Sequence, residues 1–230
     1  MKACLKTPLR KMIIGSLALI AAPAAQARPV VVEMFTSLAC SSCPSADSLL
    51  AILAKNPNIL PLSLNITYWN NAAFSDPDAL QAATDRQAWY AGLTNTQDVY
   101  TPEAVVDGTT QLVGSDSAKL TAAIATAQAA PAGDILITLT NAPMLTLKIG
   151  PGTGNATIWL FGYDSKHTNH IGGGENGGTT ISEINVVKSI TNLGTWTGLQ
   201  IALTMSHPAG QHLAAILQTP TGAVLGAKAE

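Results

Sequence analysis

The sequence predicts an α/β core followed by an antiparallel, β-rich region. Between residues 29 and 130, short β-branched runs alternate with segments whose apolar residues recur at helical spacing. Beyond residue 130 the helical spacing stops, and strand-like segments follow one another, separated by Gly and Asn turns. We therefore expect an α/β domain at 28–130 and a β-rich C-terminal domain at 131–230.

Residues 1–27 have the features of a secretory signal peptide. Basic residues precede an apolar run from about Met12 to Ala22, and Ala25-Gln26-Ala27 fits the small-x-small cleavage rule. The alternative is an N-terminal membrane anchor, but a spanning helix needs about 20 apolar residues. We expect cleavage between Ala27 and Arg28, and a mature protein that is periplasmic or secreted.

The mature chain would be acidic. Removing the signal leaves 8 Lys and Arg against 14 Asp and Glu, a net charge of −6. Such a surface is a poor match for nucleic acid or for an anionic membrane. We expect no nucleic-acid partner and no membrane association after signal cleavage.

The first half alternates strands with helices. Each strand is a run rich in apolar residues, and the helices open at or near proline or serine and stop near Asn, Pro or Gly. The expected order is a strand at 29–36, a helix at 43–56, a strand at 59–69, a helix at 77–93, a hairpin at 103–114 and a helix at 115–130 with Ser115 as its cap.

The second half consists of strands only. Alternating segments are expected at 135–141, 144–150, 155–164, 179–190, 199–205, 212–219 and 223–229. The glycine-rich stretch 171–178 reads as a flexible loop. It is not a phosphate loop, because no Lys-Ser/Thr follows it.

Cys40 and Cys43 lie between the first strand and the first helix. A disulfide that closes so short a loop stabilises a fold only weakly. A purely structural disulfide is therefore a poor explanation of the pair. A helix N-terminus lowers a thiol pKa, and the thiolate is the attacking species in disulfide exchange. Cys40, expected to be the more exposed, would be the nucleophile and Cys43 the resolving thiol. Pro44 should delay the helix start, with Ser41 or Ser42 as cap.

Several motifs resemble those of known families. The first half looks like the thioredoxin superfamily, and the chain is closer to an exported family of uncharacterised proteins, domain of unknown function 1223 (DUF1223). The motifs are VEMFTSLACSSCPSAD, YWNNAAFSDP, DRQAWYA, VYTPEAVVDG, GENGGTT and NVVKSITNLGTWTG. This resemblance implies a thioredoxin-like core followed by a family-specific β region, and it supplies no demonstrated activity.

The resemblance also implies site residues. It places a cis bond at Thr101-Pro102, opposite the cysteine pair, where Thr101 would offer backbone hydrogen bonds to a bound peptide. It aligns Glu33 with the buried acid of the first thioredoxin strand, which could take the proton of the resolving thiol. Alternatively, Glu33 points to solvent or to a neighbouring strand. Ala39 replaces the tryptophan that precedes the first cysteine in thioredoxins.

Aromatic residues gather in segments that should flank the cysteine pair. They could line a peptide groove, or they could pack in the core, as aromatic residues more often do. They are Tyr68, Trp69, Trp89, Tyr90 and Tyr100. We select Trp69 and Tyr100, together with Thr101 and Pro102, as candidate substrate-binding residues.

Metal ligation is the weaker interpretation of the remaining residues. His167 and His170 have an H-x-x-H spacing, but the segment reads as a loop beside the glycines, where a solvated role is more common. The cysteine pair with one histidine could bind copper or zinc. We expect no metal and no cofactor.

The leading hypothesis is an exported thiol-disulfide oxidoreductase whose partners are protein or peptide thiols and disulfides. One alternative is a non-enzymatic partner-binding module in which the cysteine pair is inert or acts as a redox switch. Another alternative is a metal-handling protein that uses the two thiolates.

Overall fold

The computed structural model describes residues 1, 28–94, 98–130 and 135–230. Except for Met1, the expected signal peptide lies outside these residues. Within them the chain forms three helices, α1 (Cys43–Leu53), α2 (Gln81–Thr94) and α3 (Ser117–Ala129). It also forms eleven strands: β1 (Val30–Thr36), β2 (Ile59–Asn65), β3 (Glu103–Val106), β4 (Thr110–Val113), β5 (Ile137–Asn141), β6 (Leu145–Ile149), β7 (Ala156–His170), β8 (Thr180–Trp196), β9 (Ile201–Met205), β10 (His212–Gln218) and β11 (Val224–Ala229). The expected α/β class with an antiparallel β-rich C-terminal region is confirmed.

Strands from both halves of the chain share one sheet. Its order is β11-β10-β7-β8-β2-β1-β3-β4, and the chain crosses from one half to the other where β8 lies beside β2. That junction is parallel and has a single registered pair, Ser63 with Val186. The expected boundary at residue 130 therefore does not coincide with a boundary between sheets.

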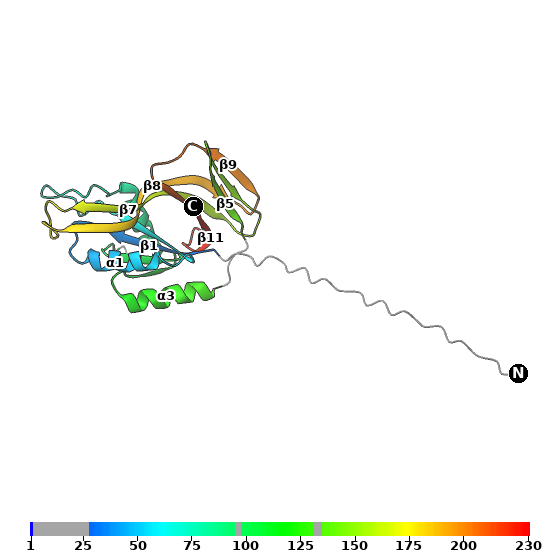
Figure 1. Ribbon diagram of the computed structural model, residues 1–230, viewed down its shortest axis with the longest axis horizontal. Helices are drawn as coiled ribbons and strands as arrows, with labels where there is room; N and C mark the ends of the chain where they lie inside the picture. Colours follow the sequence, from blue (N-terminus) through cyan, green and yellow to red (C-terminus); the bar gives the residue numbers. More distant parts are fainter. Residues whose placement is uncertain (2–27, 95–97, 131–134) are drawn as a thin grey trace.

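The two faces of β1 bury different side chains, because successive residues of a strand point to opposite faces. Val32 and Met34 pack against α1 and α3, which lie side by side beneath the sheet in Figure 1. Val31 and Phe35 pack on the other face with residues of α2 and of the C-terminal strands. The site residues that follow are divided between these two faces.

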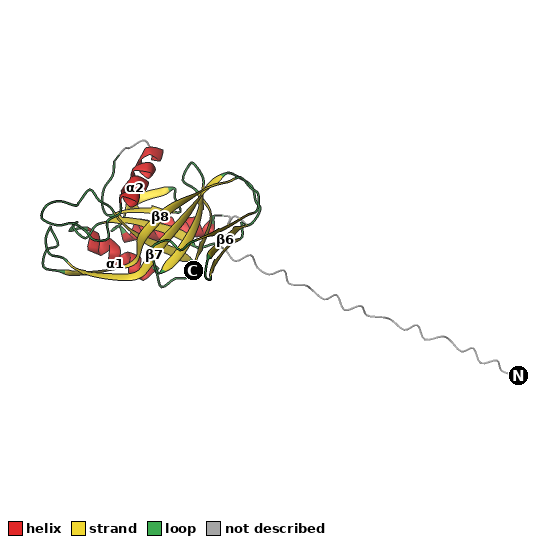
Figure 2. Cartoon of the chain, turned by 90° about the horizontal axis from the view of Figure 1, so that it is seen from above, coloured by secondary structure: helices red, strands yellow, loops and turns green. Residues whose placement is uncertain are grey.

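A second sheet, β5-β6-β9, packs on the C-terminal strands. Ile137 and Leu147 join Ile158, Trp196 and Leu217 in one apolar cluster. Figure 2 shows β7 and β8 as long strands through the middle of the molecule, with β6 beside them. This second sheet lies away from the cysteine pair, which follows the end of β1.

Some element bounds differ from the sequence expectation. Helix α2 begins at Gln81 rather than Pro77, because residues 77 and 78 form a turn and the Leu80 N–H donates to the Asn65 carbonyl on β2. Asp116 caps α3 instead of Ser115, since its side chain accepts a hydrogen bond from the Lys119 N–H. Strand β7 continues to His170, so the two histidines expected in a loop lie on a strand.

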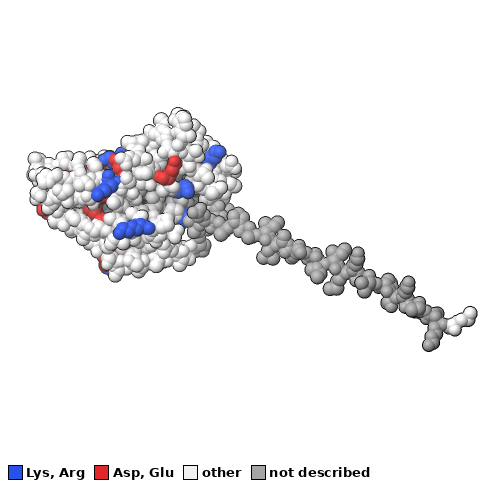
Figure 3. Space-filling view, in the orientation of Figure 1, with Lys and Arg blue, Asp and Glu red and all other residues white. Residues whose placement is uncertain are grey.

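The surface carries few charges. Lys and Arg side chains and Asp and Glu side chains are scattered over the face shown in Figure 3, with neither sign forming a large patch. In the described part of the chain, no helix is long and apolar enough to cross a membrane.

Candidate functional site

The cysteine pair sits where β1 turns into α1. Cys40 lies in the turn before the helix, and the Cys43 N–H donates to the Cys40 carbonyl at 3.2 Å. Helix α1 begins at Cys43, with Ser42 at the N-cap position and Pro44 in the first turn. The N-cap position of Ser42 agrees with the expectation, but Cys43 is helical although it precedes Pro44. Both cysteines are free thiols, and both are buried.

The surroundings of Cys40 favour a thiolate. A hydrogen bond from the Cys43 thiol is the main cause that lowers the Cys40 pKa to about 5, against the opposing effect of burial. The Ser42 hydroxyl lies 3.2 Å from the Cys40 sulfur and adds to this stabilisation, as does Thr101. Cys40 is therefore the thiol that ionises first, as the nucleophile assignment requires.

Cys40 was expected to be the more exposed of the two cysteines, but both are almost completely buried. Only 1% of the Cys40 surface is accessible, compared with 0% for Cys43. The cover comes partly from the β7–β8 hairpin, whose tip spans residues 171–179. The Asn176 side chain donates to the carbonyls of Leu38 (2.9 Å) and Cys40 (2.8 Å).

A second contact of the hairpin tip involves an exposed acid. The Glu175 carboxylate accepts hydrogen bonds from the Ser41 N–H (3.0 Å) and the Ser41 hydroxyl (2.6 Å). These bonds lower the Glu175 pKa. The GENGGTT motif of the second half thus contacts the turn that carries the cysteine pair.

One of the buried acids on the cysteine side of the sheet, Asp47, lies next to the resolving thiol. The Thr36 hydroxyl donates to the Asp47 carboxylate at 2.9 Å, and Thr36 also hydrogen-bonds the Cys43 thiol. Burial raises the Asp47 pKa to about 7, with a contribution from the charge of Cys40. The hydrogen bond with Cys40 and burial raise the Cys43 pKa far above its ordinary value. A hydroxyl thus links the resolving thiol to a carboxyl that titrates near neutrality.

Sequence reasoning missed Asp47, although a signal was present. Asp47 lies four residues after Cys43, and residues four apart share one face of a helix. An acid at that spacing in the first turns of the helix could have been recognised as a neighbour of the resolving thiol.

Glu33 does not reach the cysteine pair. It lies three residues before Thr36 and therefore on the other face of β1. There its carboxylate forms a buried ion pair with Arg86 and accepts a hydrogen bond from the Tyr90 hydroxyl at 2.6 Å. Arg86 also donates to Gln218 at 2.9 Å. This corrects the expectation that Glu33 takes the proton of the resolving thiol.

Of the candidate substrate-binding residues, Thr101 contacts Cys40 directly. The Thr101-Pro102 bond is cis, as expected. The Thr101 carbonyl lies 3.8 Å from the Cys40 sulfur, and the Trp69 indole N–H donates to the Thr101 hydroxyl at 2.7 Å. Tyr100 is 36% exposed, and its carbonyl accepts a hydrogen bond from Gln87.

The other aromatic residues divide between surface and core. Tyr68 is 43% exposed, whereas Tyr90 is fully buried. Trp89 is half-buried and contacts Tyr90 with ring centroids 4.8 Å apart. Tyr90 and Trp89 thus pack around the Glu33–Arg86 pair and do not line a groove beside Cys40.

The two histidines do not form a metal site in the described residues. His167 is bonded to Asp78, which also pairs with Lys188, and His170 lies near the Thr180 hydroxyl. Across residues 28–94, 98–130 and 135–230, no three His, Cys, Asp or Glu side chains converge in a way that could hold a metal ion.

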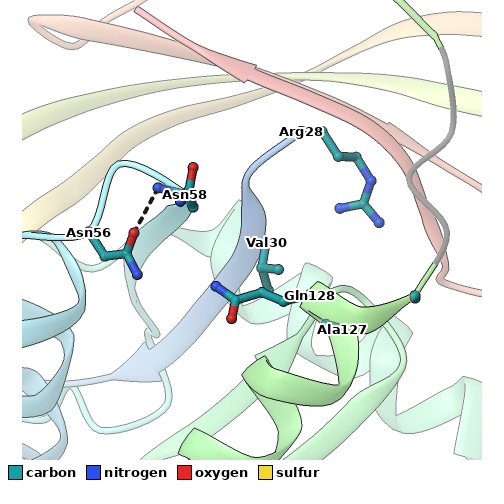
Figure 4. Close-up of a pocket in the computed structure, with 7 residues that line it drawn as sticks. Arg28, Val30, Asn56, Asn58, Ala127 and Gln128 are labelled. Atoms are coloured by element: carbon teal, nitrogen blue, oxygen red, sulfur yellow. Dashed lines mark hydrogen bonds between the residues drawn. The ribbon is translucent and has the colours of Figure 1, made fainter. Parts of the chain in front are cut away.

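One cavity of about 420 Å³ lies at the opposite end of β1 from the cysteines. Figure 4 shows Arg28, Val30, Asn56 and Asn58 around it, with Ala127 and Gln128 from α3. Cys40 follows the far end of that strand. This cavity is therefore separate from the cysteine turn.

The fold and the site define an α/β protein with a Cys-x-x-Cys pair at the start of a helix and a cis-proline beside it. The chain belongs to the DUF1223 family, described as a protein of unknown function, whose family model matches residues 31–221.

Two solved structures are similar to the chain. One is the X-ray crystal structure of a protein from Agrobacterium tumefaciens, a structural genomics target. It is 26% identical, has a TM-score of 0.77, and the match covers 89% of this chain and 94% of that chain. The other is HBP35 of Porphyromonas gingivalis, at 13% identity and a TM-score of 0.54, with 89% and 75% covered. The second likeness concerns the fold alone. No curated protein matches the sequence.

Proposed function

We propose that the protein is an exported thiol-disulfide oxidoreductase that acts on protein or peptide thiols and disulfides. The observation that carries the proposal is the asymmetry of the pair: the pKa of Cys40 is lowered to about 5, whereas that of Cys43 is raised. An exchange enzyme needs this difference, because one thiol must attack while its neighbour stays protonated until it resolves the intermediate. The position of the pair at the start of helix α1, with the cis-proline at Thr101-Pro102 beside it, supports the same function.

The reaction would begin at Cys40. Its thiolate attacks one sulfur of a substrate disulfide, a mixed disulfide forms, and the other substrate sulfur leaves as a thiolate and takes up a proton. The Cys43 thiol then gives its proton through the Thr36 hydroxyl to Asp47, and its thiolate attacks the Cys40 sulfur. The substrate is released as a dithiol, and Cys40 and Cys43 form a disulfide. With a substrate dithiol as the reductant, the same steps run in reverse.

The substrate would lie against the residues around Cys40. Thr101 would hydrogen-bond the substrate backbone beside the reacting sulfur, and the exposed side of Tyr100 together with Trp69 would border it. Substrate entry would also require the hairpin tip at Glu175 and Asn176 to move or to accommodate it, because Cys40 is covered.

A trapping experiment tests the proposal. The Cys43→Ser variant should accumulate mixed disulfides with substrate, because it lacks the resolving thiol, while Cys40→Ser should accumulate none. Trapping by Cys40→Ser alone would reverse the assigned roles, and trapping by neither variant would exclude exchange through this pair.

The reduction potential of the pair provides a second test. Equilibration in glutathione or dithiothreitol buffers should give a value between about −120 and −270 mV, the range of working exchange enzymes. A value below about −300 mV would mark a structural disulfide. The burial of Cys40 would then favour the second candidate function, a partner-binding module with an inert or switch-like pair.

A further inference from the structure

Three buried carboxyl groups on the α1 side of the sheet form a carboxyl cluster. They are Asp47, Asp76 and Glu183, which are 6%, 4% and 1% exposed. None of the ion pairs in the described residues includes any of them. The nearest charged groups beyond the cluster are Asp78 with its partners Lys188 and His167, of which His167 lies across from Glu183 on β7, and the Cys40 thiolate.

Two of these carboxyl groups share one amide group. The Asn65 side chain donates to Asp76 at 3.1 Å and to Glu183 at 3.2 Å. Two ionised carboxylates held this close together and away from water would repel each other strongly. Because no cation is bonded to either group in the described chain, one of the two must carry a proton.

The hydrogen-bond donors show which group is neutral. Asp76 accepts bonds from the Leu38 N–H at 2.8 Å and the Asp78 N–H at 2.9 Å, in addition to the Asn65 amide. Backbone N–H donors favour the ionised form of a carboxyl group.

Glu183 has a different set of contacts. Among the described residues, its carboxyl group is hydrogen-bonded to the Asn65 amide and to the Ser63 hydroxyl, each at 3.2 Å. A hydroxyl can accept a hydrogen bond as well as donate one, so it can pair with a protonated carboxyl. Burial, followed by the charges of Asp47 and Asp76, raises the Glu183 pKa well above its ordinary value.

We propose that Glu183 is a neutral carboxylic acid at neutral pH and that it positions the turn before Cys40 through Asn65 and Asp76. Asp76 accepts a hydrogen bond from the Leu38 N–H, and the Asn65 amide donates to Asp76. The same amide donates to Glu183 on β8, so Glu183 fixes the position of Asn65. The second half of the chain thus contacts the cysteine turn in two ways. Glu183 on β8 positions it through Asn65 and Asp76, and the hairpin tip covers Cys40.

The neutral state of Glu183 has a consequence for Asp47. With Glu183 protonated, Asp47 faces one buried negative charge fewer, so it can still release and take up a proton near neutrality. This consequence rests on the proposed function, whereas the protonation of Glu183 and its support of the turn do not.

Side-chain carboxyl ¹³C NMR titration of the full mature chain tests the protonation states. The Glu183 resonance should keep the position of a protonated acid at pH 7, and Glu183→Gln should leave the Asp47 midpoint unchanged, because a neutral amide replaces a neutral acid. Asp76→Asn should lower the proton affinity of Asp47 by roughly tenfold, because a charge is lost. A Glu183 resonance typical of a carboxylate, or a reversed response of the two variants, would overturn the proposal.

Alkylation of Cys40 tests the positioning role. Glu183→Ala should raise the alkylation rate at pH 7 by roughly tenfold, because the turn opens more often, and Glu183→Gln should keep the wild-type rate. The exposed Glu175→Gln variant serves as a control for the NMR titration and should leave the Asp47 midpoint unchanged. Equal alkylation rates in Glu183→Ala and the wild type would remove the positioning role.

These readouts do not require disulfide exchange. If the trapping experiment fails while Glu183 is found protonated, the proposed function falls and this inference stands. If trapping succeeds and Glu183 is found ionised, the proposed function stands and this inference falls.

Discussion

The two faces of the central sheet bury acids in contrasting ways. On the α2 face, Glu33 is paired with Arg86, whose guanidinium lies 5.0–5.9 Å from the centroids of four aromatic rings. On the α1 face, Asp47 accepts a hydrogen bond from the Thr36 hydroxyl and forms no ion pair within the part of the chain that the structure describes. Similar burial therefore has different results: Glu33 forms a structural ion pair, whereas Asp47, which has no cationic partner in the described residues, has a raised pKa beside the two thiols.

The largest expected effect concerns the paired acid. Glu33→Gln should lower the free energy of unfolding by about 3–5 kcal/mol, because Arg86 would be left as a buried charge without its carboxylate. Urea unfolding of the wild type and the variant measures the loss. The Lys119→Gln variant breaks an exposed pair with Asp116 and should leave the stability close to that of the wild type.

The alkylation of Cys40 tests whether the Glu33–Arg86 pair on the other face of the sheet affects the cysteine pair. Cys40 in Glu33→Gln should be alkylated at the wild-type rate at pH 7, because Glu33 lies on the other face of β1. A clear change of rate in a folded variant would contradict the division between the two faces.

The next effect concerns Asp47. Asp47→Asn should slow the resolution of the mixed disulfide by roughly 10²-fold, because the Cys43 proton loses its acceptor. The decay of a purified mixed disulfide, followed by quenched samples and mass spectrometry, measures this rate. The first step, attack by Cys40, should remain fast. Unchanged resolution in Asp47→Asn would show that Asp47 is not the acceptor.

A smaller effect concerns the pH dependence of stability. Burial raises the Asp47 pKa from 3.8 to about 7, so the stability linked to Asp47 is present below about pH 4 and is lost as pH rises through about 7. The reduced wild-type protein should therefore lose more stability between pH 4 and 7 than Asp47→Asn does. Part of the slope should persist in the variant, because burial also raises the Glu103 pKa to about 7. Parallel curves would argue against a raised pKa.

The smallest expected effect concerns the hairpin tip. Asn176→Ala should raise the alkylation rate of Cys40 at pH 7 a few-fold, because the Leu38 and Cys40 carbonyls lose their donor. His170→Gln changes an exposed residue on the same hairpin and should leave the rate unchanged. A variant Asn176→Ala that reacts like the wild type would show that the tip does not limit access.

Local features of the site were predictable from the sequence. The strand before the pair, the late helix start at Pro44 and the cis bond before Pro102 each depend on residues close together in the chain or on a specific motif. The class of fold was predictable for the same reason, since strand and helix periodicities are local.

The remaining features depend on distant pairing. Glu183 and Asn176 reach the cysteine side only because β8 lies beside β2, and no short-range pattern encodes that neighbour. The position of His167 on a strand was missed because charged and polar residues occupy both faces at the end of β7, which removes the alternation that predicts strands. The face on which Glu33 lies follows from strand alternation, but its Arg86 partner comes from another element.

The narrow junction between β2 and β8 also bears on the order in which the molecule assembles. Ser63 and Glu183, which bond across it, are 120 residues apart, and a single registered pair joins the strands there. Contacts of such long range form late, because a large loop must close before they stabilise anything. Because the N-terminal half is synthesised first, the two cysteines are present well before the strands that support and cover them. An oxidant or a chaperone would meet the pair uncovered during that interval, and only the completed sheet would restrict which molecules can reach it.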